Sequence, residues 1–144
     1  MKNIYVILST LCIGIILIGC QSQQETMVLL DEEISEINLS LSNGTGEMND
    51  EIIFTVKDEK DVEIFENAIL TATKQNNYGK LEIPHYDVMV EYKSEEGKLP
   101  THAIHLWLGE ENENSIFTYM MSEDVYHTSP KVTMELRKIL LSEE

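Results

Sequence analysis

The side chains that could bind a metal ion or carry protons are four histidines and a large excess of carboxylates. His102 and His105 lie three residues apart on a predicted strand, so their rings point to opposite faces of a sheet and cannot share one ion. His85 and Asp87 lie two residues apart, on one face, and could supply half of a metal site if further ligands came from elsewhere. No His-Glu-x-x-His sequence and no Asp-x-Asp-x-Asp-Gly loop is present. We therefore expect neither a metal ion nor a cofactor.

Nucleophilic catalysis has no recognisable motif in this sequence. No Gly-x-Ser-x-Gly and no Ser-x-x-Lys sequence occurs. The Asn-Gly-Thr-Gly sequence at residues 43–46 is typical of a turn and not of a phosphate loop, because no Gly-Lys-Ser/Thr follows it. Most carboxylates fall in predicted turns and on the outer faces of predicted helices, where charge is solvated. We expect a domain without catalytic residues, and the alternative is a small envelope enzyme or a metal-dependent accessory factor.

Cys20 is the one thiol whose surroundings indicate a specific reaction. It ends an apolar run that begins at Ile4, and Leu17-Ile18-Gly19 precede it directly. An aliphatic residue three positions before a cysteine, followed by small or apolar residues, resembles the lipobox of bacterial lipoproteins. The resemblance implies that the sulfur of Cys20 accepts a diacylglyceryl group as a thioether. Two acyl chains then give a stable membrane anchor, where a single chain would hold only marginally.

Residues 1–19 have the anatomy of a signal peptide, with Lys2 as the positive n-region and an apolar h-region of fifteen residues at 4–18. As a helix, fifteen residues span about 22 Å, which is short of the ~30 Å hydrocarbon core. A permanent transmembrane helix is therefore the weaker interpretation, and a plain secretory signal would make the position of Cys20 a coincidence. We predict cleavage before Cys20 and lipid anchoring on the extracytoplasmic side of the cell membrane.

This processing divides the chain into three parts: the signal peptide, a lipidated N-terminus and polar tether at 20–26, and a single domain at 27–144. The mature chain has 125 residues, which suits one domain with one core. Cys12 is removed with the signal peptide and Cys20 is modified. The domain therefore has no disulfide, and its stability must come from an apolar core and backbone pairing.

The mature chain is strongly acidic, with nine basic residues against twenty-six acidic ones and a net charge of about −17. Nucleic acid is excluded as an expected partner because its binding needs clustered lysine and arginine. An anionic lipid surface would also repel the domain. The charge therefore predicts solubility and stand-off from the bilayer, and a basic partner or a cation is the alternative.

Alternating apolar and polar residues predict an antiparallel sheet of about five to six strands. The clearest alternation is at residues 36–42 and 86–93, with further strands at 51–57, 101–108 and 115–121 and a short apolar run at 27–30. Short turns that join consecutive strands require antiparallel pairing. Parallel pairing of the strands that flank the first helix stays open.

Two helices are predicted. Asp58 is a candidate N-cap for a helix at about 59–74, whose apolar stripe begins at Val62 and Phe65. Ser129 is a candidate N-cap for a final helix, with Pro130 at its first position. The fold class is therefore α+β, with an antiparallel sheet packed against two helices.

The predicted strand at 101–108 suggests where a partner could bind. Ile104, Leu106 and Leu108 form its core face, which leaves His105 and Trp107 on the other face of the sheet. We expect this second face to be covered as well, by the N-terminal segment or a loop, because large aromatic side chains are mostly buried. If it is open, His105 and Trp107, with Tyr126 nearby, form a candidate patch for an envelope protein or a small ligand.

Several short segments resemble one family in their order and spacing. The chain is similar to the YhfM-like domain of small Gram-positive lipoproteins from about Glu51 to Leu141, and the lipobox agrees. The matching segments are Phe65, Ala68 and Ile69, then Pro84-His85-Tyr86-Asp87, then His105-Leu106-Trp107-Leu108, then Tyr126-His127-Thr128-Ser129. The resemblance implies a lipid-anchored extracytoplasmic domain of unknown biochemical role, with no catalytic residues to transfer.

Overall fold

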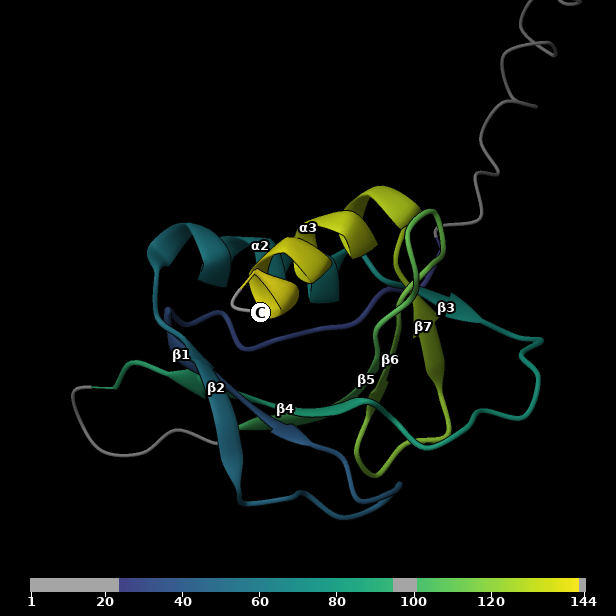
Figure 1. Ribbon diagram of the computed structural model, residues 1–144, viewed down its shortest axis with the longest axis horizontal. Helices are drawn as coiled ribbons and strands as arrows, with labels where there is room; N and C mark the ends of the chain where they lie inside the picture. The colour runs from purple at the N-terminus through teal and green to yellow at the C-terminus, as the bar shows by residue number, and fades with distance from the viewer. Residues whose placement is uncertain (1–23, 95–100, 143–144) are drawn as a thin grey trace, which may run out of the picture.

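A seven-stranded sheet with two helices on one face makes up the domain (Figure 1). The structure is a computed structural model that describes residues 24–94 and 101–142, so the predictions on the signal peptide and Cys20 lie outside the described residues. Within these two ranges, no helix has the length and apolar character needed to cross a bilayer. In chain order the elements are β1 (Ile34–Leu41), β2 (Ile52–Val56), α2 (Glu59–Leu70), β3 (Thr73–Gln75), β4 (Tyr86–Tyr92), β5 (His102–Trp107), β6 (Ile116–Tyr119), β7 (Val125–His127) and α3 (Pro130–Leu141).

The strand order is β2-β1-β4-β5-β6-β7-β3, and every neighbouring pair is antiparallel. The predicted α+β class is therefore confirmed, and the sheet has slightly more strands than expected. β2 and β3 flank helix α2 in the sequence but lie at opposite edges of the sheet. The parallel pairing that the sequence left open between them does not occur. Helix α2 instead carries the chain across the sheet from one edge to the other.

Helix α2 begins where the sequence predicts. The Asp58 side chain accepts hydrogen bonds from the backbone N–H groups of Lys60 and Asp61 at 3.0 and 3.4 Å, which satisfies two free donors of the first turn. The helix ends at Leu70, four residues earlier than predicted, because the chain turns at Thr71 and continues as β3. The sequence did not predict this change for two reasons. Ala72 continues the helical spacing of apolar residues, and a three-residue strand is too short to show an alternation.

Helix α3 confirms the predicted cap. The side chain of Ser129 accepts the N–H of Val132, and Pro130 occupies the first turn, where its missing N–H costs nothing. Its Leu136 and Ile139 are buried. The two helices bury their apolar stripes against one face of the sheet, called here the helix face. Its fully buried residues include Ile37, Leu39, Val88, Val90, Ile104, Leu106 and Phe117.

An N-terminal segment, residues 24–33, also packs on the helix face. It passes beneath the two helices (Figure 1), and its Met27 and Leu29 are buried in the core. The hydroxyl of Tyr119 accepts the N–H of Val28 and donates to its carbonyl, at 2.6 and 2.7 Å. Residues 27–30, an expected strand, are thus held by a side chain and are not part of the sheet.

The folded part of the chain begins before the predicted boundary at residue 27. Thr26 forms a bridge with Thr73 of β3, and the N–H of Lys74 donates to the carbonyl of Glu25 at 2.8 Å. Glu25 and Thr26, expected in a free tether, therefore extend the sheet beyond β3. This pairing shortens the polar tether by two residues.

Candidate functional site

A row of polar side chains crosses the outer face of the sheet, which is the face opposite the helices. The strand register places Ser40 beside Asp87, Asp87 beside His105, and His105 beside Thr118. These four residues, called the polar row, are all buried. A buried polar side chain costs free energy unless it is hydrogen-bonded, so the partners of this row decide what the face can do.

Asp87 and His105 form a buried hydrogen-bonded pair at the centre of the row. Nδ1 of His105 lies 2.8 Å from Oδ1 of Asp87. The other ring nitrogen, Nε2, accepts the backbone N–H of Gly46 at 3.2 Å. Because a nitrogen that accepts cannot carry a proton, this contact fixes a neutral ring with its proton on Nδ1, donated to Asp87.

The β1–β2 loop, residues 42–51, supplies the remaining partners of Ser40, Asp87 and His105. Oδ2 of Asp87 accepts the N–H of Asn49 at 2.9 Å, and Oγ of Ser40 donates to the carbonyl of Asn49 at 2.6 Å. Gly46 has a φ of +95°, in the left-handed region where a side chain would be strained. The loop therefore needs glycine at this position to direct its N–H at His105.

This arrangement indicates a structural pair. An aspartate–histidine pair acts in catalysis when Nε2 is free to take a proton from a nucleophile or a water. Here Nε2 of His105 already accepts the Gly46 N–H, and Asp87 uses both oxygens within the protein. The hydrogen bonds of the pair hold the β1–β2 loop against the sheet.

Trp107 is covered, as the sequence predicts. Its ring is buried, its Nε1–H donates to the carbonyl of Glu82 at 2.8 Å, and its centroid lies 6.3 Å from that of His105. The cover comes from the β3–β4 loop, residues 76–85, one of the two kinds of segment that the sequence left open. The single tryptophan therefore belongs to the interior of the outer face.

The structure does not bring His105, Trp107 and Tyr126 together as one exposed patch. Tyr126 pairs with Phe117, which in turn pairs with Leu106, so Tyr126 lies on the helix face. His105 and Trp107 point to the outer face, and all three are buried. The grouping fails because it required the register of three strands, β5, β6 and β7, which the local sequence pattern does not provide.

His85 and His102 also make hydrogen bonds within the protein, whereas Nε2 of His127 is buried without a partner in the part of the chain that the structure describes. His102 and His105 point to opposite faces, which confirms the prediction that they cannot share an ion. Nδ1 of His85 accepts the N–H of Leu108 at 3.1 Å, and Asp87 is bound to His105, so neither member of the proposed half-site is free. Among residues 24–94 and 101–142, no group of three histidine, cysteine or acidic side chains could hold a metal ion.

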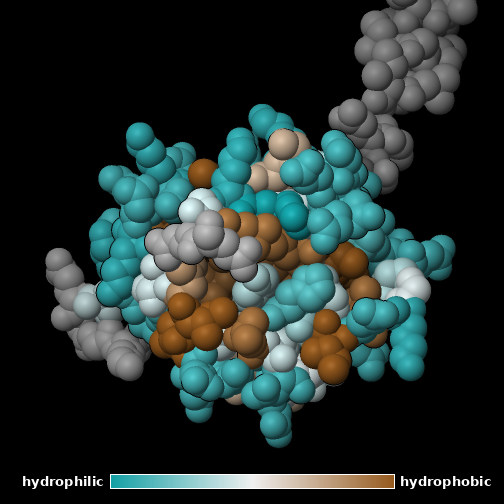
Figure 2. Space-filling view, in the orientation of Figure 1, coloured by the Kyte–Doolittle hydropathy of each residue, from teal (hydrophilic) through white to brown (hydrophobic). Residues whose placement is uncertain are grey.

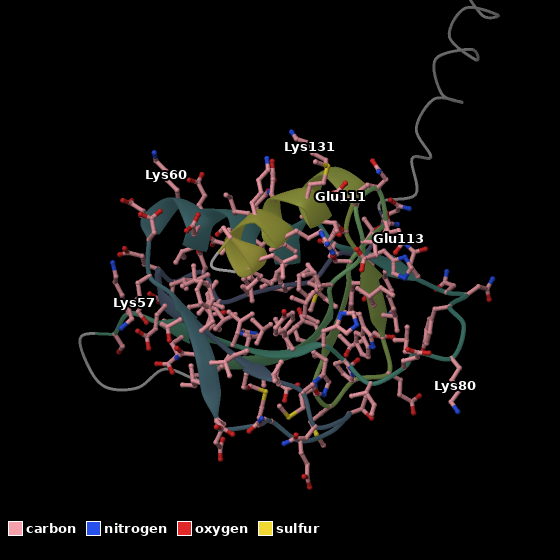
Figure 3. The ribbon with its side chains drawn as sticks, in the orientation of Figure 1. Lys57, Lys60, Lys80, Glu111, Glu113 and Lys131 are labelled. Carbon is pink, nitrogen blue, oxygen red and sulfur yellow. The ribbon has the colours of Figure 1, made fainter. Side chains whose placement is uncertain are left out.

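A surface hollow opens on this side of the molecule between the β1–β2 and β3–β4 loops. His85 sits in it with Nδ1 occupied, so Nε2–H is available as a donor to a ligand. Ile83 is exposed, and Lys80 extends away from its loop into solvent (Figure 3). The hollow has a volume of about 720 Å³ and is lined by Thr45, Lys80, Leu81, Glu82, Ile83 and His85.

The hollow combines exposed apolar side chains with donors, which suits a ligand that has both an apolar part and hydrogen-bond acceptors. Among its residues, only His85 is a candidate ligand from the sequence, and there for half of a metal site. The remainder were missed because they come from two irregular loops that meet only in the folded chain. The turn signal at residues 43–46 was the one clue to the first of these loops.

Comparisons with known proteins agree with this fold. The family model described as YhfM protein matches residues 30–144. No curated protein matches the chain. Among solved structures, the chain is similar to a thioesterase-like protein from Clostridium sporogenes, with a TM-score of 0.57 and 16% identity, over 79% of this chain and 98% of that one. At this identity the likeness shows a shared fold alone.

The His105→Ala substitution tests the structural role of the pair. It leaves the Asp87 carboxylate buried without its main donor, so we expect the free energy of unfolding to fall by about 3 kcal/mol. Urea denaturation followed by far-UV circular dichroism measures this change, with the exposed Met121→Ala as control. The β1–β2 loop should also be cut faster by protease. Unchanged stability together with unchanged cleavage would contradict the assignment.

Stability should also fall as the pH falls below about 6.5, the ordinary histidine pKa. Burial lowers the pKa of His102 and of His127 in the folded state, so both bind protons more readily when the chain unfolds. Their contribution is complete above the unfolded pKa and is lost as the pH falls through it. Denaturation at pH 7.5 and 5.5 should show a smaller loss for a His102→Gln/His127→Gln variant. Equal losses in both proteins would refute this origin.

Proposed function

The chain belongs to the YhfM protein family, and we propose that it works as a lipid-anchored domain on the extracytoplasmic side of the cell membrane, where it binds a protein or a small ligand. The observation that carries the binding role is that Asp87 and His105 are fully hydrogen-bonded within the protein and so have no free atom for acid–base catalysis. The observation that carries the location is the Leu-Ile-Gly-Cys sequence that ends at Cys20.

The anchor and the fold are separated by very little chain. Within the part of the chain that the structure describes, Glu25 and Thr26 already contact β3. Five residues from Cys20 to Glu25 reach about 17 Å at most. A lipid on Cys20 would therefore keep the β3 edge of the domain near the headgroups, and the net charge of about −17 would disfavour flat contact with an anionic surface.

A binding role explains how the polar groups of the outer face are used. The residues most suited to acid–base chemistry, Asp87 and His105, are consumed in fixing the β1–β2 loop. That loop forms one wall of the surface hollow through Thr45. The interior pair thereby gives the hollow a fixed shape, and a preformed site binds without the cost of ordering a loop.

An envelope enzyme is the second candidate. Its support is the Asp87–His105 distance of 2.8 Å, together with the thioesterase-like description of the similar structure from Clostridium sporogenes. For catalysis the β1–β2 loop would have to lift, so that the N–H of Gly46 leaves Nε2 of His105. The two hydrogen bonds that Asn49 makes to Ser40 and Asp87 oppose this opening, and for that reason we favour binding.

The Cys20→Ser substitution tests the anchor. The serine hydroxyl cannot form the thioether, so the protein should keep its leader or appear unlipidated, and mass spectrometry of the membrane and soluble fractions measures this. Cys12→Ser is the matched control, because it changes a thiol inside the predicted signal peptide and should leave lipidation intact. A wild-type protein with an unmodified thiol at the mature terminus would refute anchoring.

Substitution of Ile83 tests the hollow. Ile83→Lys places a charge among its apolar side chains, so partners crosslinked to the intact protein in its own membranes should be recovered at least about tenfold less. Met121→Lys makes the same change at an exposed residue outside the hollow and should leave recovery unchanged. Equal recovery by wild-type protein and the Ile83→Lys variant would reject the hollow as the binding surface.

A further inference from the structure

The two edges of the sheet differ in how they are covered. At the β3 edge, Thr26 pairs with Thr73, and the N–H of Met27 donates to the carbonyl of Ala72 at 3.3 Å. The Lys74 N–H donates to the carbonyl of Glu25. These bonds satisfy the β3 edge within the chain, so further strand pairing is blocked on this side.

The β2 edge has no such cover among the described residues. β2 is the last strand on its side of the sheet, and its neighbour β1 pairs only with β2 and β4. Ile52 and Ile53 are 53% and 52% exposed at this edge. An open edge strand presents unpaired N–H and C=O groups and is a template for another strand. Exposed isoleucines add an apolar driving force for such pairing.

The sequence of this edge is complementary to itself. In an antiparallel pair of two β2 strands centred on Phe54, Phe54 faces its own copy and Ile53 faces Thr55. Continued one residue beyond each end of β2, the same register sets Glu51 opposite Lys57 on both sides of the centre. Cross-strand aromatic pairs and opposite charges both stabilise antiparallel strands. We propose that β2 pairs with β2 of a second copy of this chain, which joins the two sheets into one.

The surface next to Phe54 fits this arrangement. A hollow of about 400 Å³ lies between β2 and the helices, with Phe54, Ile64 and Ile139 among its lining residues. Figure 2 shows hydrophobic atoms exposed on this side of the molecule, between the helix layer and the lower strands. The lining also includes Asp61, Glu135, Lys138 and Ser142, so a second Phe54 placed across the two-fold axis would cover the apolar part of a mixed surface.

Charge selects the register of the proposed pair. Lys57 extends away from the domain near the end of β2 (Figure 3) and already pairs with Glu36 at 2.8 Å. Its side chain is 68% exposed, so Glu51 of a second copy can also approach it. The register of β2 against β1 shifts at Ile53, so the regular ladder that a second copy would extend covers Phe54, Thr55 and Val56. The net charge of −16 opposes association at long range, so added salt should favour the dimer.

Cysteine crosslinking of the full chain tests this proposal. Phe54→Cys places two thiols across the two-fold axis, and mild oxidation in membranes should give a disulfide-linked dimer of the mass of two chains on a non-reducing gel. Met121→Cys is the control, because Met121 is 88% exposed and lies outside β2. A second pair, Ile53→Cys coexpressed with Thr55→Cys, repeats the test should Phe54→Cys impair folding. Dimer no stronger than the Met121→Cys control would overturn the proposal.

Charge reversal in the Phe54→Cys background tests whether the strand that pairs with β2 comes from a second copy of this chain. Glu51→Lys alone and Lys57→Glu alone each place like charges opposite each other, so the dimer yield should fall roughly fivefold. The double reversal Glu51→Lys/Lys57→Glu restores opposite charges between copies and should restore the yield. A yield that stays low in the double variant, or a crosslinked product containing a different protein, would refute pairing with a second copy.

Discussion

The hydrogen bond between Asp87 and His105 is the constraint on which the outer face of the sheet depends. Two side chains that would normally be solvated are placed under a loop, and each must find a partner there. They do so with each other and with the backbone of residues 46 and 49. The hydrogen bonds that offset the cost of burying these polar groups form only when the loop is in this position. Any other position would leave a buried donor or acceptor unpaired.

The two faces of the sheet are closed by different means. Apolar side chains of α2, α3 and residues 24–33 close the helix face, where the energy comes from removing hydrocarbon from water. The outer face is closed at its centre by two loops whose contacts are directional, including the Trp107 bond to the carbonyl of Glu82. Such loops can form a surface with donors and acceptors in fixed places, which an apolar helix face does not offer. Of the two hollows described above, the larger lies on the loop side.

Local signals in the sequence predicted much of the fold. The caps at Asp58 and Ser129 and the alternation in β4 and β5 were sufficient because each depends on residues close together in the chain. β3 and β7 have three residues each and show no period, so only their pairing partners reveal them. The Asp87–His105 pair was missed although both residues were considered. The antiparallel register of β4 and β5 sets them opposite each other, and the local sequence pattern does not give that register.

The position of residues 24–33 has a consequence for how the chain acquires its structure. Val28 is held by the hydroxyl of Tyr119, 91 positions later, and Leu30 by that of Tyr92. The earliest part of the domain to be synthesised therefore finds its partners only when most of the chain is present. Native contacts with such large separations slow folding. In a nascent chain of this protein, residues 28 and 30 therefore lack these partners until the strands that carry Tyr92 and Tyr119 have been synthesised.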